Sequence, residues 1–372
     1  MHRPIKTLNR EYLNKPEEND FSQDIESKKK IFAKKKFIRG IVGIFITLAL
    51  LWFLAPHAKP KLFLLLARNA QPNMLAWASL IYAAIFILRS HRFHLMFRER
   101  NIRYQGLFAV VSLHSFFNHI LPFRAGELSY IHLQNKYHKI PYSEGSASLI
   151  LARLYDILAL FFLGFMLLLP FLLPQTDQPI GFILWVVFVL MVFFLLLFFL
   201  KRFSVFASVN NLLHHLLSLP HKSPGLGGKI MRFTQKVLAH SSDMIKDAHF
   251  SRLLSVSMAI WLLTFLYFFI IFRALGQGLC FMESLLPAYG AIVGNLLPIN
   301  GLGSIGTFET GLTFGQISIG KGHYISVPIA FMVHAHVILV GLILSIFSWA
   351  YLHFRLKSGV HLKSKQNLTS KH

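Results

Sequence analysis

Four residues near position 120 combine polar chemistry with an apolar setting: Asn118, Pro122, Arg124 and Glu127. Pro122 has no amide proton and is tolerated in the first turn of a helix, so we expect a helix to begin there with the positive end of its dipole near Arg124. A forked guanidinium suits phosphate, and Glu127 can neutralise it from the same helical face. This first cluster is either a phosphate contact or an ion pair that closes the end of a hairpin.

Arg153 and Asp156 form a second cluster, at the start of a long apolar segment. A spacing of three residues places both on one face of a helix, and the neighbouring leucines indicate that this face turns inward. An ionisable group at membrane depth costs a few kcal/mol, so each needs a partner or a wet cavity. The pair is either a structural salt bridge or a substrate contact, and both alternatives predict that removing one partner is damaging.

A third cluster combines helix-breaking and polar residues: Asn295, Pro298, Gly301, Gly303, Gly306 and Glu309. Glycine lets a backbone approach a ligand closely, and we expect Ser304 or Thr307 to cap the helix that follows. A glycine-rich stretch alone is weak support for binding. The support for binding is stronger here, because the amide and carbonyl groups of an unwound backbone in a bilayer have no water to hydrogen-bond with.

The first and third clusters resemble each other, since each has an asparagine, then Leu-Pro, then glycine and glutamate. An inverted repeat with two broken helices would produce this pattern, and so would chance similarity of two short segments. If the repeat is real, we expect a binding site near the bilayer midplane between the clusters, with alternating access as the mechanism.

Histidine and cysteine offer little catalytic or metal chemistry. His334 and His336 point to nearly opposite faces of a helix, so they cannot easily share a metal, and His114 and His119 are typical of hydrogen-bonded packing residues. A single cysteine, Cys280, excludes an internal disulfide framework. We recognise no catalytic triad or metal-binding motif, and we expect no cofactor and no metal.

The composition predicts the elements that must position these clusters. Hydrophobic residues make up 54% of the 372 residues and charged residues 14%, against roughly 25% charged in a soluble domain. Since a spanning helix needs about 20 apolar residues, we predict an all-α, polytopic membrane protein. We expect six spans at about 37–55, 73–95, 146–173, 180–200, 251–272 and 325–351, and two re-entrant or broken helices within 107–121 and 285–318.

The distribution of charge predicts the orientation of the chain. With the N-terminus in the cytoplasm and both broken segments returning to the side they came from, 32 of the 38 Lys and Arg residues fall in cytoplasmic pieces, residues 89–106 among them. Cytoplasmic loops collect such residues, so both termini are expected inside. The formal charge of +23 is therefore explained by topology, and no nucleic acid partner is expected.

Three regions are expected along the chain. Residues 1–36 form a basic cytoplasmic tail, 37–351 the transmembrane domain with an amphipathic cytoplasmic loop at 201–250, and 352–372 a second basic tail. Basic segments of this kind bind anionic inner-leaflet lipids.

Together, the first cluster, the Arg153 and Asp156 pair and the late proline and glycine pattern ending at Glu309 resemble the lysylphosphatidylglycerol synthase transmembrane-region family, over about residues 37–350. The resemblance implies translocation of a phospholipid, an aminoacylated phospholipid or a polyprenyl-linked or other glycolipid between leaflets, in a bacterial inner membrane. It also implies that Arg124, Glu127, Arg153, Asp156 and Glu309 are polar residues of a buried cavity.

Two departures from the family limit what the resemblance implies. The sequence stops at His372 without a soluble aminoacyltransferase domain, so lysyl transfer itself is not expected. Ala152 stands where many members have an acidic residue, which questions any role that needs this carboxylate. Two alternatives stay open: a membrane-embedded transferase with Glu127 or Glu309 as general base, and an accessory scaffold for a separate lipid synthase.

Overall fold

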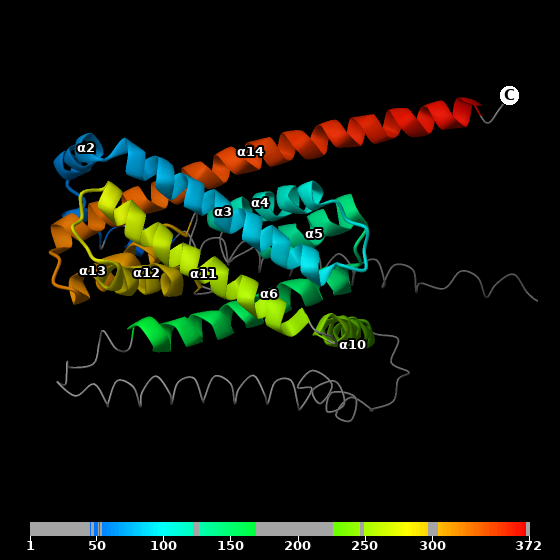
Figure 1. The fold of residues 1–372 in the computed structure, drawn as a ribbon, viewed down its shortest axis with the longest axis horizontal. Coiled ribbons are helices and arrows are strands. Elements are labelled where there is room, and N and C mark those ends of the chain that lie inside the picture. Colours follow the sequence, from blue (N-terminus) through cyan, green and yellow to red (C-terminus); the bar gives the residue numbers. More distant parts are fainter. Residues whose placement is uncertain are drawn as a thin grey trace, which may run out of the picture.

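The computed structural model describes residues 45, 48–50, 52, 54–121, 126–168, 226–245, 249–296 and 304–369, and every regular element in these residues is helical. Pro60 and Pro72 open the first two long helices, where a missing amide proton costs nothing. The elements in chain order are η2 (Ala55–His57), α2 (Pro60–Asn69), α3 (Pro72–Met96), α4 (Tyr104–Ile120), α5 (Gly126–His138), α6 (Tyr142–Leu163), η4 (Gly164–Leu168), α10 (Leu226–Ile245), α11 (His249–Ala274), α12 (Phe281–Leu296), α13 (Thr307–Ser318) and α14 (His323–Thr369) (Figure 1).

Four described helices are long and apolar enough to cross a membrane: Pro72–Met96, Tyr142–Leu163, Phe250–Ala274 and Tyr324–Phe354. They correspond to four of the six predicted spans, and they confirm an all-α membrane protein. The other two predicted spans, 37–55 and 180–200, lie mostly or wholly outside the described residues.

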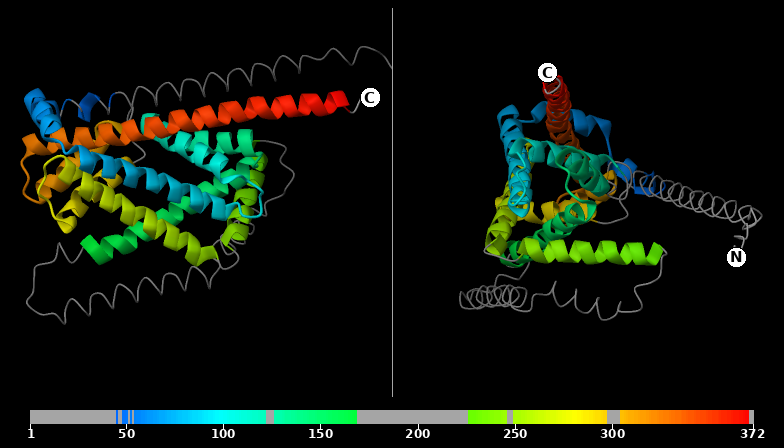
Figure 2. Two further views of the ribbon diagram at one scale, coloured as in Figure 1. Left: turned by 45° about the horizontal axis from the view of Figure 1, so that its top comes forward. Right: turned by 90° about the vertical axis from the view of Figure 1, so that its right-hand side faces the viewer.

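Two boundaries differ from the prediction. The sixth predicted span does not end as a helix at position 351, because α14 continues to Thr369 and runs past the other helices in Figures 1 and 2. The third does not continue as one α-helix to position 173, because a π-helical turn, η4, follows α6 directly. In the cytoplasmic loop predicted at 201–250, the part that is described includes α10, which packs against α6.

The two broken segments form helical hairpins. The first, 107–121, belongs to one unbroken helix, α4, and α5 packs back against it so closely that a Cβ on Gly126 would overlap the backbone of Asn118. In the second, α12 and α13 lie side by side and run antiparallel. Small residues at the contact allow this approach in a setting where lipid removes most of the hydrophobic drive for helix association.

Two clusters of buried apolar side chains meet inside the bundle. Most residues of the first come from α11, α12, α13 and α14, and most of the second from α4, α5 and α6. The helices α3, α6, α11 and α14 contribute to both. Along α3, Phe86 belongs to the first cluster and Phe93 to the second. Arg89 and Arg92 therefore lie at the seam between the two clusters.

Candidate functional site

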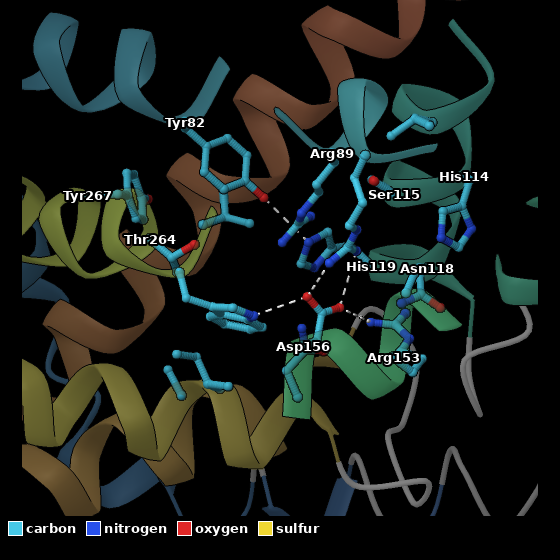
Figure 3. Close-up of a pocket in the computed structure, with 18 of the residues that line it drawn as sticks. Tyr82, Arg89, His114, Ser115, Asn118, His119, Arg153, Asp156, Thr264 and Tyr267 are labelled. Carbon is cyan, nitrogen blue, oxygen red and sulfur yellow. Dashed lines mark hydrogen bonds and ion pairs between the residues drawn. The ribbon is translucent and has the colours of Figure 1, made fainter. Parts of the chain in front are cut away.

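A cavity of about 130 Å³ lies at this seam, and both helical hairpins contribute to its wall (Figure 3). Side chains from α3, α4, α6, α11, α12, α13 and α14 line it. Its charged lining residues and its two asparagines are Arg89, Arg92, Arg153, Asp156, Asn118 and Asn295.

Asp156 of α6 is held by donors from two other helices. Arg92 of α3 donates to its two carboxylate oxygens, at 2.6 Å from Nη1 to Oδ1 and 3.3 Å from Nη2 to Oδ2. Trp261 of α11 donates from Nε1 to Oδ1 at 3.0 Å, and the Arg92 Nη1 also donates to Ser257 at 3.0 Å. Arg92 and Asp156 are both buried, so this network satisfies charges that would otherwise be costly at this depth.

Arg153 bridges two carboxylates. Its Nη2 donates to the Glu127 Oε1 at 3.0 Å, and its Nη1 lies 3.7 Å from the Asp156 Oδ2. The predicted placement of Arg153 and Asp156 on one helical face is therefore what the structure shows. The closer partner of Asp156 is Arg92, although the charge distribution predicts a cytoplasmic position for residues 89–106.

Arg89 is the cavity cation with no counter-ion in the described part of the chain. None of the described carboxylates lies within ion-pair distance of its guanidinium, which stands 6.0 Å from the ring centroid of Phe86. Ionised lining side chains carry three positive charges and one negative charge, and adding Glu127 leaves a net charge of +1. A positive charge is thus available for an anion in the cavity.

Glu309 does not line the cavity but lies in the layer behind it. Its Oε2 accepts the Gly306 amide proton at 2.7 Å, and its Oε1 lies 2.6 Å from the His334 Nδ1. The ring of Phe308, which does line the cavity, stacks on His334 with centroids 4.5 Å apart.

The cap of α13 differs from the prediction. Neither Ser304 nor Thr307 is the N-cap residue; that position is Gly306, with φ of 96°. Glycine tolerates this positive φ, and the side chain of Glu309 supplies the cap to its amide.

The ten candidate residues from the sequence fall into three groups. Those that line the cavity are Asn118, Arg153, Asp156 and Asn295. Glu127 and Glu309 lie behind the lining, each paired with a basic side chain. Pro122, Arg124, Gly301 and Gly303 lie outside the described residues, and so does the predicted pairing of Arg124 with Glu127.

Sequence reasoning missed Arg89 and Arg92. Both were assigned to the cytoplasmic stretch 89–106, yet they lie within α3 and line the cavity. The available signal was their spacing of three residues inside an apolar helix, the same signal that identified Arg153 and Asp156.

The fold and the cavity define an all-helical integral membrane protein with a buried basic site. The chain belongs to the family described as lysylphosphatidylglycerol synthase TM region, whose model matches residues 40–345. It is also similar to the "Glycosyltransferase AglD" of Haloferax volcanii, with 26% identity over 122 residues. That match covers 32% of this chain and 20% of the relative, so the chain matches about a fifth of the relative's length. No solved structure shows a significant match.

Proposed function

We propose that the cavity binds the anionic headgroup of a membrane lipid and carries it between leaflets. Membership of the family supports a lipid-related function. The preference for an anionic headgroup rests on the position of Arg89 in the cavity wall. A guanidinium with no described counter-ion, beside two further arginines, suits a phosphate oxygen better than it suits a neutral or cationic headgroup.

The size of the cavity supports a headgroup rather than a whole lipid. Its volume of about 130 Å³ is well below the roughly 300–1,000 Å³ of pockets that enclose small-molecule ligands. The acyl or prenyl chains would stay in the bilayer while the polar group crosses. In this account Asn118 and Asn295, one from each hairpin, donate to the headgroup from opposite sides.

The setting we propose is the cytoplasmic membrane of a bacterium, with both termini inside. The basic tails would then lie against anionic inner-leaflet lipids, and a separate synthase would supply the lipid.

Leaflet exchange in liposomes tests this function. Purified full-length protein is reconstituted with fluorescent phosphatidylglycerol or a fluorescent neutral lipid, and the fraction accessible to an impermeant quencher is followed over time. We expect exchange of the anionic lipid to be faster than in protein-free liposomes and faster than exchange of the neutral lipid. Equal rates with and without protein for both lipids would count against the proposal.

A membrane-embedded transferase is the second candidate. The name of the Haloferax volcanii relative favours it, and Glu127 is the carboxylate best placed to act as a base near the cavity. Incubation of the purified protein with a polyprenyl phosphate and nucleotide sugars separates the two functions, because a transferase forms a new glycolipid and a translocator does not.

A further inference from the structure

A buried carboxylate and imidazole lie directly behind the cavity wall. Glu309 and His334 are 1% and 2% exposed, and their atoms Oε1 and Nδ1 are 2.6 Å apart. The Nε2 of the same imidazole is buried and makes no hydrogen bond to any described residue. The unpartnered Nε2 therefore leaves a position for one further proton on an imidazole that already lies against a carboxylate.

The titratable side chains of the neighbouring helices are mostly engaged elsewhere or exposed. The Tyr267 hydroxyl of α11 lies 3.0 Å from the His336 Nδ1, and Lys61 and Arg68 of α2 are exposed. From α4 comes His119, whose ring centroid lies 6.4 Å from that of His334, and from α3 comes Tyr82, whose hydroxyl lies 3.4 Å from the His119 Nε2. The titratable side chains of α12 are directed elsewhere. Tyr289 donates to the Leu160 carbonyl, and Glu283 accepts the Cys280 amide proton at the start of that helix.

A line of buried polar groups leads from the pair along α13. Thr313 and Gln316 follow Glu309 at spacings of four and three residues, so they share its face of the helix. Both are buried, and the Thr313 hydroxyl and the two amide atoms of Gln316 have no hydrogen-bond partner among the described residues. Buried polar groups of this kind are normally met by ordered water, which can also conduct protons. The line ends near the exposed Ser318.

We infer that Glu309 and His334 form a proton-binding site that couples lipid movement to a pH gradient. The inference rests on the proposed function of the cavity. One proton enters from the acidic side and converts the pair from a net charge of −1 to 0. It leaves on the alkaline side, and no covalent bond other than the one to this proton changes.

The location of the pair gives the direction of coupling. The added positive charge lies behind Phe308, in the wall of the cavity, where it favours an anionic headgroup. Loss of the proton weakens this preference. A monoanionic headgroup would therefore enter from the acidic side, leave on the alkaline side and carry one proton with it.

The test uses full-length protein in liposomes with fluorescent phosphatidylglycerol, an acidic exterior, an alkaline lumen and the membrane potential clamped at zero. For each protein the readout is the ratio of inward movement with the gradient to inward movement at equal pH. We expect a severalfold ratio for the wild type and a ratio near unity for Glu309→Gln and His334→Gln. Glu283→Gln is the matched control, because Glu283 also caps a helix through the amide three residues before it but has no histidine partner among the described residues. It keeps the wild-type ratio.

A ratio of unity for the wild type would overturn the coupling while leaving lipid movement intact. A second readout keeps the two proposals apart: infrared difference spectra on lowering the pH, recorded on folded, monodisperse protein. We expect a pH-dependent band from the pair, from the imidazole ring of His334 or the carboxyl group of Glu309, that Glu309→Gln removes or shifts and Glu283→Gln retains. If this band appears and no lipid moves, the function proposed for the cavity fails and the proton site stands; if the band does not depend on Glu309, the proton site fails.

Discussion

Arg92 and Asp156 face each other at the seam between the two apolar clusters, joined by two hydrogen bonds of 2.6 Å and 3.3 Å. Trp261 and Ser257 attach the same network to α11, so α3, α6 and α11 are tied together at one point. Both Asp156 oxygens accept hydrogen bonds from these donors, and the two terminal nitrogens of Arg92 are engaged by Asp156 and Ser257. It therefore stabilises the cavity wall and leaves Arg89 as the cation open to a ligand.

Removing one partner of this pair should be strongly destabilising. Asp156→Ala leaves the Arg92 guanidinium buried without its carboxylate, and we expect a loss of about 3–5 kcal/mol in the free energy of unfolding. The thermal midpoint in detergent measures this, with Arg68→Gln on the exposed surface of α2 as the control. The double variant Arg92→Met with Asp156→Leu should recover most of the loss, and a double variant as unstable as Asp156→Ala would contradict the account.

The α12–α13 hairpin should tolerate no side chain at its closest approach. A Cβ on Gly290 would overlap the Gly311 carbonyl, so Gly290→Ala forces the two backbones apart, and we expect a cost of roughly 1–3 kcal/mol. Gly278→Ala is the control, because a Cβ there meets no atom within 4 Å. Equal thermal midpoints for the two variants would show that the helices are less tightly packed than the structure indicates.

The single cysteine provides a test of orientation. Cys280 is exposed, and it follows α11 at the end opposite the 201–250 loop. If the N-terminus and that loop are cytoplasmic, Cys280 lies outside, so a membrane-impermeant maleimide should label intact cells. Pretreatment with a permeant thiol reagent should abolish the signal. Labelling that occurs only after lysis would show that Cys280 lies on the cytoplasmic side, opposite to the predicted orientation.

Glu127 limits the positive charge of the cavity. Glu127→Gln removes the carboxylate 3.0 Å from Arg153 and raises the net charge of the site from +1 to +2. Since both side chains are partly exposed, solvent screens the change, and we expect only a few-fold increase in the preference for anionic over neutral lipid. Competition between the two lipids for the purified protein measures this preference. Glu99→Gln, at an exposed position, should leave it unchanged.

Helix content and the approximate position of the described spans were predictable because they depend on local composition. Arg153 and Asp156 were also predictable, since a spacing of three residues inside an apolar helix places both on one face. The glycines of the third cluster indicated close backbone approach before any contact was known. In the α12–α13 hairpin, however, the close backbone approaches that the structure describes are made by Gly290, Gly294, Gly311 and Gly315.

The partners of these groups were not predictable, because they lie far apart in the sequence. Arg92 meets Asp156 across 64 positions, and His334 meets Glu309 across 25. The charge rule that placed Arg89 and Arg92 in the cytoplasm describes loops, and it does not apply to basic residues that line an internal cavity. With these two arginines included and Glu309 behind the wall, the ionised side chains at the cavity sum to +1.

The central claim is that Arg89 receives the anionic headgroup, and the initial rate of leaflet exchange tests it most directly. Wild type, Arg89→Gln and Arg103→Gln are compared in liposomes with fluorescent phosphatidylglycerol; Arg103 is an exposed arginine at the start of α4. We predict that Arg89→Gln lowers the rate at least tenfold, because a charge-assisted bond of roughly 1.5–3 kcal/mol is lost, and that Arg103→Gln leaves it unchanged. Equal rates for wild type and Arg89→Gln would contradict the claim.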